Sequence, residues 1–293
     1  MAVKAYRAVV PYAVGLFGGL AGVAAVASRS RPAAEVVAER LGEEGIAVHV
    51  EGVRGSLARA AEEAARRLLE RLGEEAQLRL IARLVGDDVL LPEAHVAAAA
   101  ARAVAEMLGL EPDPFDVAEV LARATALAAG RPLAPVAAAA YTARTVVASE
   151  QPPAYATVAA PPSRLYVIPP CRGLAEPPVA VEAARHLQLA QAAAVLAATA
   201  ARGGWGPRRL WELLAQESPW DYAAPVELRD AKHRAQREGA HAAGVEPYSL
   251  ALIIAADEPG PAEAARARLE AAWACKPQLI ELEPAAPEPE ETG

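Results

Sequence analysis

Five polar residues of this chain could do chemistry. Asp87 and Asp88 follow a predicted strand, Glu93 and His95 stand at the start of a predicted helix, and Glu246 lies in a later loop. Carboxylates and an imidazole that a fold brings together can hold a metal ion and a substrate. A plainer interpretation is that the two aspartates form a polar turn, that His95 caps a helix and that Glu246 is solvated. We expect the plainer interpretation to hold.

The cysteines and histidines lack the spacing of a metal site. Cys171 and Cys275 are too few and too far apart in sequence to indicate a disulfide framework or a zinc site. None of the five histidines stands at ligand spacing from a cysteine. We therefore expect two thiols in a reducing cytoplasm and no bound metal ion.

Composition limits the class of protein. Of the 293 residues 54% are hydrophobic and only 4% are aromatic, so a large core is expected to depend on close packing of alanine. The formal net charge of −8 argues against a general nucleic-acid binder, since binding to phosphates needs clustered Lys and Arg. The chain contains no asparagine, which either a GC-rich coding bias or a hot habitat explains.

Hydrophobic periodicity and turn residues predict an alternation of helices and strands. We expect Gly73 and Gly130 to end two helices, and the small residues Ala240 to Val245 to form a turn. The predicted helices are Ser56–Leu72, Pro92–Ala105, Asp113–Ala129, Val179–Ala201, Pro207–Ala215, Arg229–Glu238 and Pro261–Trp273. The predicted strands are Ala2–Val10, Ile46–Glu51, Gln77–Val85, Thr142–Ala148, Arg164–Ile168, Leu250–Ala255 and Gln278–Glu283.

The segment from Glu238 to Ile254 resembles the third motif region of the GHMP small-molecule kinases, homoserine kinases in particular. In that family a helix ends in a run such as EAGALGAGISGSGPTVFAL, and this chain aligns EGAHAAGVEPYSLALII with it without a gap. The small scaffold residues fit, Gly244 among them. The serine-glycine loop does not, because residues 246–250, which include Tyr248 and Ser249, stand in its place.

A second resemblance begins at Pro92. In the family a strand leads into P-x-x-x-G-L-G-S-S-A-A-S and a long helix, and the glycines and serines of this loop hold the nucleotide phosphates. Pro92 matches, but alanines replace the glycines and serines, among them Ala97, Ala98 and Ala99. Alanine favours continuous helix, and Glu93 adds negative charge where the phosphates would approach. We expect an ordinary helix start in place of the cradle for Mg-ATP.

The uncharged segment Ala8–Ser28 has two interpretations. Taken alone it looks like a signal peptide or a short membrane helix, but a proline and four glycines interrupt it. The resemblance implies instead a strand that leads into the first motif loop, PATSANLGPGFD in homoserine kinases. Gly18 keeps its place in that loop, whereas Leu16 and Gly22 replace its asparagine and aspartate. We expect no membrane segment and a cytoplasmic protein.

The resemblance covers about residues 2 to 283 and implies an α+β GHMP kinase fold. Such a fold has an N-terminal α/β domain of the ribosomal S5-like type and a C-terminal ferredoxin-like α/β sandwich, with the active site between them. We place the domains at residues 1–150 and 151–283. Residues 284–293 are acidic and proline-rich, so we expect a disordered tail. The family also implies ATP and Mg²⁺, a small alcohol such as homoserine as substrate, and commonly a homodimer.

Two functions are open. Phosphoryl transfer depends on positioning and electrostatic stabilisation of the phosphates, and all three loops that would position them have lost their diagnostic residues. The first hypothesis is a protein that has lost ATP binding and phosphotransfer, needs no cofactor, and acts as a binding or regulatory homologue in a homodimer or in a hetero-oligomer with a related protein. The second is a divergent ATP-dependent kinase of a homoserine-type alcohol that uses the five polar residues above. We prefer the first.

Overall fold

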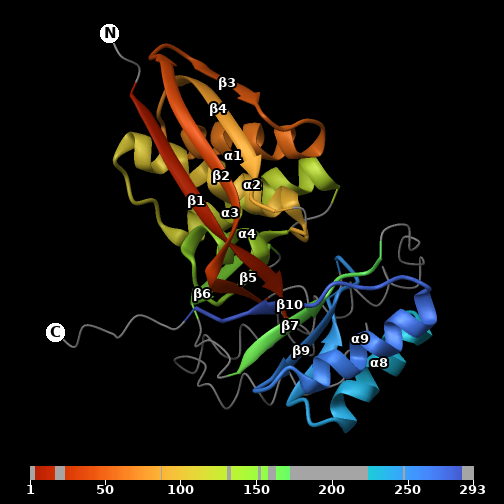
Figure 1. Cartoon of the computed structure of the whole chain (residues 1–293). Coiled ribbons are helices and arrows are strands. Elements are labelled where there is room, and N and C mark those ends of the chain that lie inside the picture. Colours follow the sequence, from red (N-terminus) through yellow and green to blue (C-terminus); the bar gives the residue numbers. More distant parts are fainter. Residues whose placement is uncertain are drawn as a thin grey trace, which may run out of the picture.

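The structure of the chain, a computed structural model, describes residues 4–16, 24–86, 88–130, 133–150, 153–157, 163–171, 224–246 and 248–285. The predicted helices Val179–Ala201 and Pro207–Ala215 lie outside these residues, as do Gly18, Asp87 and most of the predicted tail. The described chain forms two β-sheets, and helices cover one face of each sheet (Figure 1).

The first sheet is built around one long strand. Its six strands are β1 (Ala5–Gly15), β2 (Ala24–Gly42), β3 (Ile46–Glu51), β4 (Ala76–Leu84), β5 (Val146–Glu150) and β6 (Pro153–Thr157). The order is β3-β4-β2-β5-β6, and β1 also pairs with β2. Only β3 and β4 are parallel to each other. The 19 residues of β2 are long enough to pair with β4 and β5 along different parts of their length.

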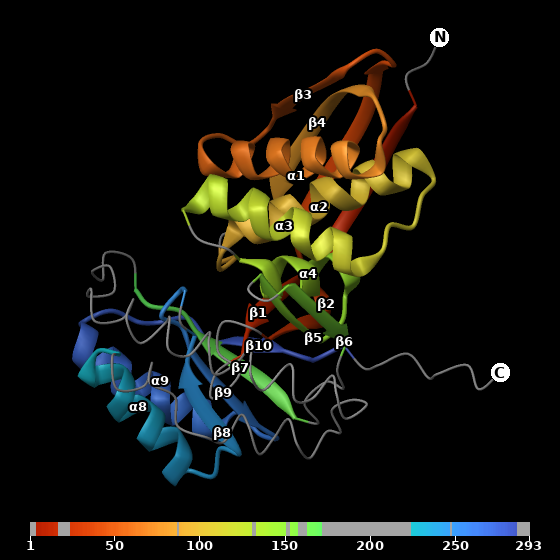
Figure 2. The same ribbon diagram turned by 180° about the vertical axis from the view of Figure 1, so that it is seen from behind.

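Helices of the first half cover one face of the first sheet (Figure 2). They are α1 (Ser56–Leu72), α2 (Pro92–Leu108), α3 (Pro114–Ala129) and α4 (Ala134–Thr142). The predicted stops are confirmed, because Gly73 and Gly130 adopt the left-handed backbone conformation that glycine tolerates best. Helix α2 lies at the centre, and every side chain from Ala94 to Ala101 is fully buried. Alanine makes this possible, since its small side chain lets neighbouring helices and strands approach closely.

The second sheet has the ferredoxin-like arrangement that the resemblance implied. Its strands are β7 (Arg164–Ile168), β8 (Ala242–Val245), β9 (Leu252–Ala256) and β10 (Ile280–Leu282). They are antiparallel neighbours in the order β10-β7-β9-β8. The helices α8 (Val226–Arg237) and α9 (Gly260–Trp273) lie side by side on one face (Figure 1). This order of a split βαβ unit confirms the prediction for the C-terminal half.

The two sheets share a core. It contains Tyr12, Val14, Leu16, Ala24, Val26, Ala33 and Val147 from the first half, with Leu165, Val167, Ala242, Ala251, Ile253, Ala255, Ile280 and Leu282 from the second. The chain after β10 continues beside β2, where the Arg29 amide donates to the Glu283 carbonyl at 2.7 Å and the Ala285 amide to the Ala27 carbonyl at 2.9 Å. The halves are therefore joined by packing and by backbone hydrogen bonds. The predicted boundary at 150/151 falls between the paired strands β5 and β6 of the first sheet.

Several predicted boundaries are wrong. Strand β1 runs past Pro11 to Gly15, because among the described strands β1 pairs only with β2, and an edge strand tolerates a residue without an amide hydrogen. The predicted turn Ala240–Val245 contains the strand β8, and the strand expected from Thr142 begins at Val146 after the end of α4.

The membrane alternative for the N-terminal segment finds no support in the described residues. The described residues of Ala8–Ser28 lie in β1 and β2, apart from Leu16, whose amide donates to the Ala24 carbonyl at 2.7 Å. No helix among the described ranges is long and apolar enough to cross a bilayer.

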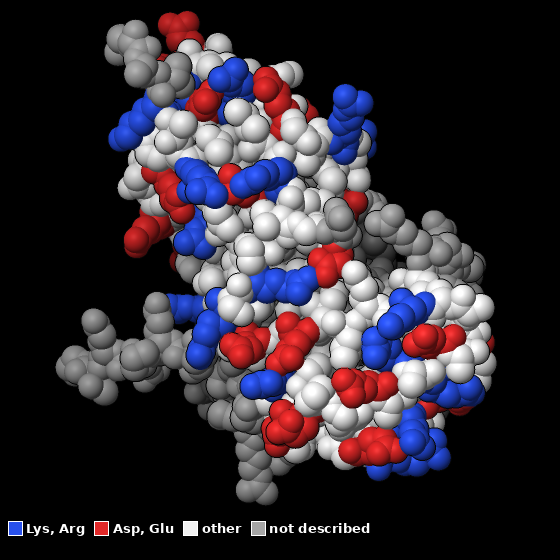
Figure 3. Space-filling view, viewed as in Figure 1, with Lys and Arg blue, Asp and Glu red and all other residues white. Residues whose placement is uncertain are grey.

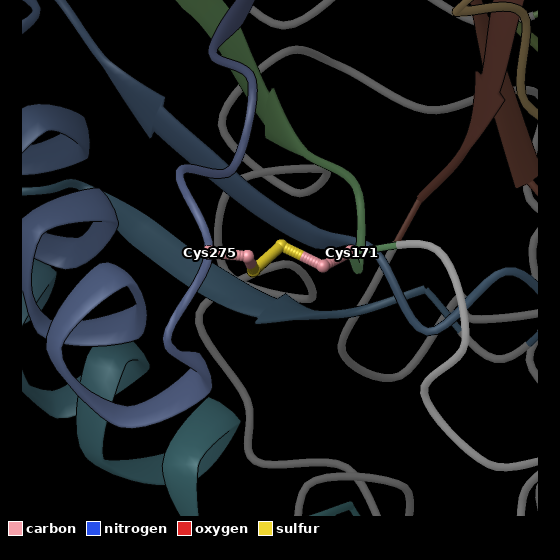
Figure 4. Close-up of a disulfide and its surroundings, with 2 residues drawn as sticks. All are labelled: Cys171 and Cys275. Atoms are coloured by element: carbon pink, nitrogen blue, oxygen red, sulfur yellow. A yellow bond between two sulfur atoms is a disulfide. The ribbon is translucent and has the colours of Figure 1, made fainter.

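The expectation of two separate thiols is wrong, because Cys171 and Cys275 form a disulfide (Figure 4). Their Cα atoms are 6.6 Å apart although 104 positions separate them in sequence. The cause is the antiparallel pairing of β7 with β10. Cys171 follows β7 and Cys275 precedes β10, so both stand at the same end of this strand pair.

Charged side chains of both signs are interspersed over the surface seen in Figure 3. On the face of the first sheet opposite the helices, Glu35 accepts hydrogen bonds from Arg7 at 2.7 Å and Arg83 at 2.9 Å. These hydrogen bonds lower the pKa of Glu35 to about 2. The arginines on this face are thus engaged with neighbouring carboxylates.

Candidate functional site

Three segments meet where the resemblance places an active site. They are the end of β1, the start of α2 and the loop between β8 and β9. The Ala13 amide of β1 contacts His95 of α2, and Gly15 of β1 lies against Glu246 of the β8–β9 loop. Tyr248 of the same loop packs into the core of the first half. The structure therefore brings His95, Glu246 and Tyr248 to one region, and all three are buried.

Both ring nitrogens of His95 are engaged. The Ala13 amide donates to Nε2 at 2.9 Å, so Nε2 carries no hydrogen. Nδ1 therefore carries the hydrogen and donates to the Leu91 carbonyl at 3.2 Å. Complete burial lowers the pKa of His95 to about 4. The predicted helix cap is wrong: His95 is a neutral bridge from α2 to β1, without a nitrogen available to accept a proton from a substrate.

Asp88 is held by the first half of the chain. Its carboxylate accepts from the Arg31 guanidinium, and its carbonyl accepts from the Tyr12 hydroxyl at 3.2 Å. The Tyr12 hydroxyl accepts in turn from the Leu90 amide at 3.2 Å. Burial raises the pKa of Tyr12 to about 12, so this hydroxyl keeps its proton. Sequence reasoning missed Tyr12 and Arg31, because they stand 76 and 57 positions from Asp88 and no local pattern links them.

The first turn of α2 offers little to an anion. Pro92 has no amide hydrogen, and the Ala94 amide donates to the Leu91 carbonyl at 3.0 Å. The Glu93 side chain accepts from the Ser56 hydroxyl at 2.8 Å, which holds a carboxylate at this end of the helix. A helix N-terminus binds anions through free amides and its positive end, and here both are reduced.

The next turns of α2 are enclosed. Ala97, Ala98 and Ala99 stand inside an unbroken helix that begins at Pro92, and none of them is exposed. Their backbone amides lie beyond the first turn, where helical hydrogen bonds to preceding carbonyls are expected. No glycine-rich loop replaces the helix at this point.

The β8–β9 loop is closed around its own carboxylate. Oε2 of Glu246 accepts from the amides of Tyr248 at 3.1 Å and Ser249 at 2.7 Å, and from the Ser249 hydroxyl at 2.5 Å. Glu246 is only 1% exposed, so the prediction that it is solvated is wrong. Polar donors within the loop replace water at Oε2, which offsets part of the cost of burying this carboxylate. Gly244 lies just before this loop in the buried strand β8.

A pocket of about 580 Å³ opens beside Asp88, between the two halves. Its wall contains Val89 and Leu90 from the first half, and Pro169 to Cys171 and Cys275 to Gln278 from the second. The volume suits a small molecule. Lys276 is the cation among its described lining residues. Sequence reasoning missed this pocket, since the pairing of β7 with β10 assembles its second wall. Among the described residues, no group of three or more His, Cys, Asp and Glu could hold a metal ion.

Comparison with solved structures gives the fold a name. The chain is similar to a homoserine kinase from Cytophaga hutchinsonii, with a TM-score of 0.70 and 14% identity over 97% of this chain and 96% of that one. It is similar to a galactokinase from Lactococcus lactis solved with galactose, with a TM-score of 0.66 and 10% identity over 97% and 94%. A putative homoserine kinase from Listeria monocytogenes gives 0.57 and 15% over 97% of both chains. No protein-family model and no curated protein matches the sequence.

These structures belong to the GHMP kinase superfamily. The chain therefore has the GHMP kinase fold, as the three motif regions predicted. The similarity extends over nearly the whole chain, so the architecture of both halves is shared.

Proposed function

We propose that this protein neither binds Mg-ATP nor transfers phosphate, and that it acts as a non-catalytic binding or regulatory protein on a GHMP kinase fold. It works in the cytoplasm without a cofactor, as a homodimer or bound to a related protein, and its disulfide is there an exception to the reduced state of most cytosolic cysteines. The proposal concerns only the chemistry of the site, since a fold can be retained when an activity is lost.

The observation that carries the proposal is the course of α2. At the segment that resembles the phosphate loop, the chain enters a helix at Pro92 and continues without interruption to Leu108. A phosphate cradle needs backbone amides that turn toward the ligand, and the amides of a buried helix are committed to the helix. The residues present therefore do not fit Mg-ATP.

The β8–β9 loop supports the same proposal. Two of its amides and one hydroxyl already bind the Glu246 carboxylate. A phosphate that approached this loop would meet a buried carboxylate in place of free donors, and the like charges would repel. His95, with both nitrogens engaged, supplies no general base.

A divergent ATP-dependent kinase of a homoserine-type alcohol is the alternative, and one observation favours it. The pocket beside Asp88 has the volume of a small-molecule site and lies between the two halves, as ligand sites often do. Its carboxylate and its lysine are of the kind that hold a polar substrate. Asp88, however, is already paired with Arg31.

A thermal-shift titration with Mg-ATP, Mg-ADP and inorganic phosphate, with and without homoserine, tests the proposal. A ligand at a hundred times its Kd stabilises a fold by ~2.7 kcal/mol, which in a chain of this size is roughly 5 °C. We expect no shift at millimolar nucleotide, whereas an active homoserine kinase tested in parallel shifts.

A magnesium-dependent shift would contradict the proposal and support the alternative. In that case Lys276→Ala, in the pocket wall, should reduce the shift, and Glu270→Ala, exposed on α9, should leave it unchanged. Light scattering of the purified chain, alone and with candidate partners from a pull-down, tests the assembly.

A further inference from the structure

The β8–β9 loop has the geometry of a small-anion site. The Tyr248 amide, the Ser249 amide and the Ser249 hydroxyl converge on a single oxygen, Oε2 of Glu246. The Ala251 amide donates to the Ser249 Oγ at 3.3 Å, which helps to direct the hydroxyl hydrogen toward the carboxylate. Consecutive amides that point into one concavity form a nest, and nests bind anions.

We infer that this loop is an oxyanion site whose ligand, in this chain, is the protein's own Glu246 side chain. The inference rests on the proposed function, because it explains why an external anion is kept out of this loop. Glu246 stands at the near end of the loop, its backbone amide donates to the Ala251 carbonyl at 2.8 Å, and its carbonyl accepts from the Leu250 amide at 3.0 Å. The backbone thus fixes the side chain so that it folds back into its own nest.

The far side of the site is closed by the first half of the chain. A methyl group built on Gly15 would lie 2.9 Å from Oε1 of Glu246, so the β1 backbone packs directly against the carboxylate. Tyr248, beside it, is buried in the core of the first half. The occupied loop therefore also joins the two halves, and any substitution at position 246 affects both the anion site and this contact.

The size of the ligand follows from the chemistry of the side chain. Truncation of glutamate to alanine removes a CH₂–COO⁻ fragment, which has the heavy atoms of acetate. The site opened by Glu246→Ala should accept formate and acetate and discriminate against propionate, since Gly15 leaves no room for another carbon. The ligand class is thus a carboxylate of one or two carbons. Inorganic phosphate, with five heavy atoms, is larger than the fragment removed and should not rescue the variant.

The experiment measures the melting temperature of four proteins in acetate, formate, propionate and phosphate, with sodium chloride at equal ionic strength as the reference. The proteins are the wild type, Glu246→Ala, Glu246→Gln and Glu270→Ala. We expect Glu246→Ala to melt lower than the wild type in chloride and to regain about 2–3 °C, saturably, in 100 mM acetate. Glu246→Gln keeps the nest filled, and Glu270→Ala is an exposed glutamate on α9, so neither should respond to acetate beyond the chloride reference.

A second substitution identifies the site of rescue. Ser249→Ala removes the hydroxyl and its 2.5 Å hydrogen bond, so in the Glu246→Ala background it should weaken the apparent affinity for acetate several-fold. Equal responses of Glu246→Ala and the wild type to acetate would overturn the inference. If Glu246→Ala is not recovered folded in chloride, its refolding yield in acetate replaces the melting temperature, and equal yields in both salts would overturn it.

This experiment can fail independently of the test of the proposed function. Binding of Mg-ATP to the wild type would refute the loss of nucleotide binding whatever acetate does to the variant. An absence of carboxylate rescue would refute only the internal ligand, even if the wild type binds no nucleotide.

Discussion

The neutral bridge at His95 makes stability depend on pH in a defined way. The unfolded chain takes up a proton near the ordinary histidine pKa of 6.5, whereas burial lowers the pKa in the folded chain to about 4. Between these values the unfolded state binds more protons, so the free energy of unfolding falls as the pH falls. The stabilisation is fully present above pH 6.5 and is lost as the pH drops toward 4.

The magnitude follows from the two pKa values. The difference between 6.5 and about 4 corresponds to roughly 3 kcal/mol of unfolding free energy in total, of which about 2 kcal/mol is already lost at pH 5. His95→Gln removes the titration and offers an oxygen that can still accept from the Ala13 amide. We expect the variant to be less stable than the wild type at pH 8, and to lose about 2 kcal/mol less between pH 8 and pH 5.

The assay is urea unfolding of both proteins at a series of pH values from 8 to 5. His233→Gln is the matched control for the loss of a histidine side chain, because His233 lies exposed on α8. If the unfolding free energies of the wild type and His95→Gln change in parallel with pH, the reasoning is refuted, because His95 would then have the same pKa in the folded and the unfolded chain.

Three further perturbations test the fold. Cys171→Ser removes the disulfide, which closes a loop of about a hundred residues. Urea unfolding should show an unfolding free energy lower by ~2–5 kcal/mol, and a reducing agent should cause the same loss in the wild type. Ala274 is exposed and ends α9 at φ 52°, where glycine is favoured by ~1 kcal/mol, so Ala274→Gly should raise the melting temperature. Gly73 ends α1 at φ 70°, so Gly73→Ala should lower the melting temperature for the same reason. Hydrogen bonds from two exposed arginines lower the pKa of Glu35 to about 2. The unfolding free energy of Glu35→Gln should therefore fall less steeply than that of the wild type as the pH drops below 4.5. At pH 7 the two proteins should differ by less than ~1 kcal/mol.

Local signals in the sequence predicted much of the fold. The stops at Gly73 and Gly130, the alternation in β4 and the alanine run of α2 each depend on neighbours within a few positions, and each is present in the structure. The motif comparison extended this to the order of elements in both halves. The strand through Pro11 was missed because it depends on β1 pairing with β2 on one side only, which no local pattern encodes.

The site was harder to predict for the same reason. Cys171 and Cys275 meet because β7 pairs with β10, and Tyr12 meets Asp88 because β1 lies beside the start of α2. Glu246 was expected in solvent because glutamate in a loop is usually exposed. Its burial depends in part on Gly15 of β1, which packs against the carboxylate from the other half of the chain, and no local pattern encodes that contact.

Calorimetric titration of the wild-type chain with Mg-ATP tests the central claim most directly. The uninterrupted helix from Pro92 and the occupied β8–β9 loop predict heats equal to those of dilution up to millimolar nucleotide, with or without homoserine. A saturable, magnesium-dependent heat with a stoichiometry near one ATP per chain would contradict the claim.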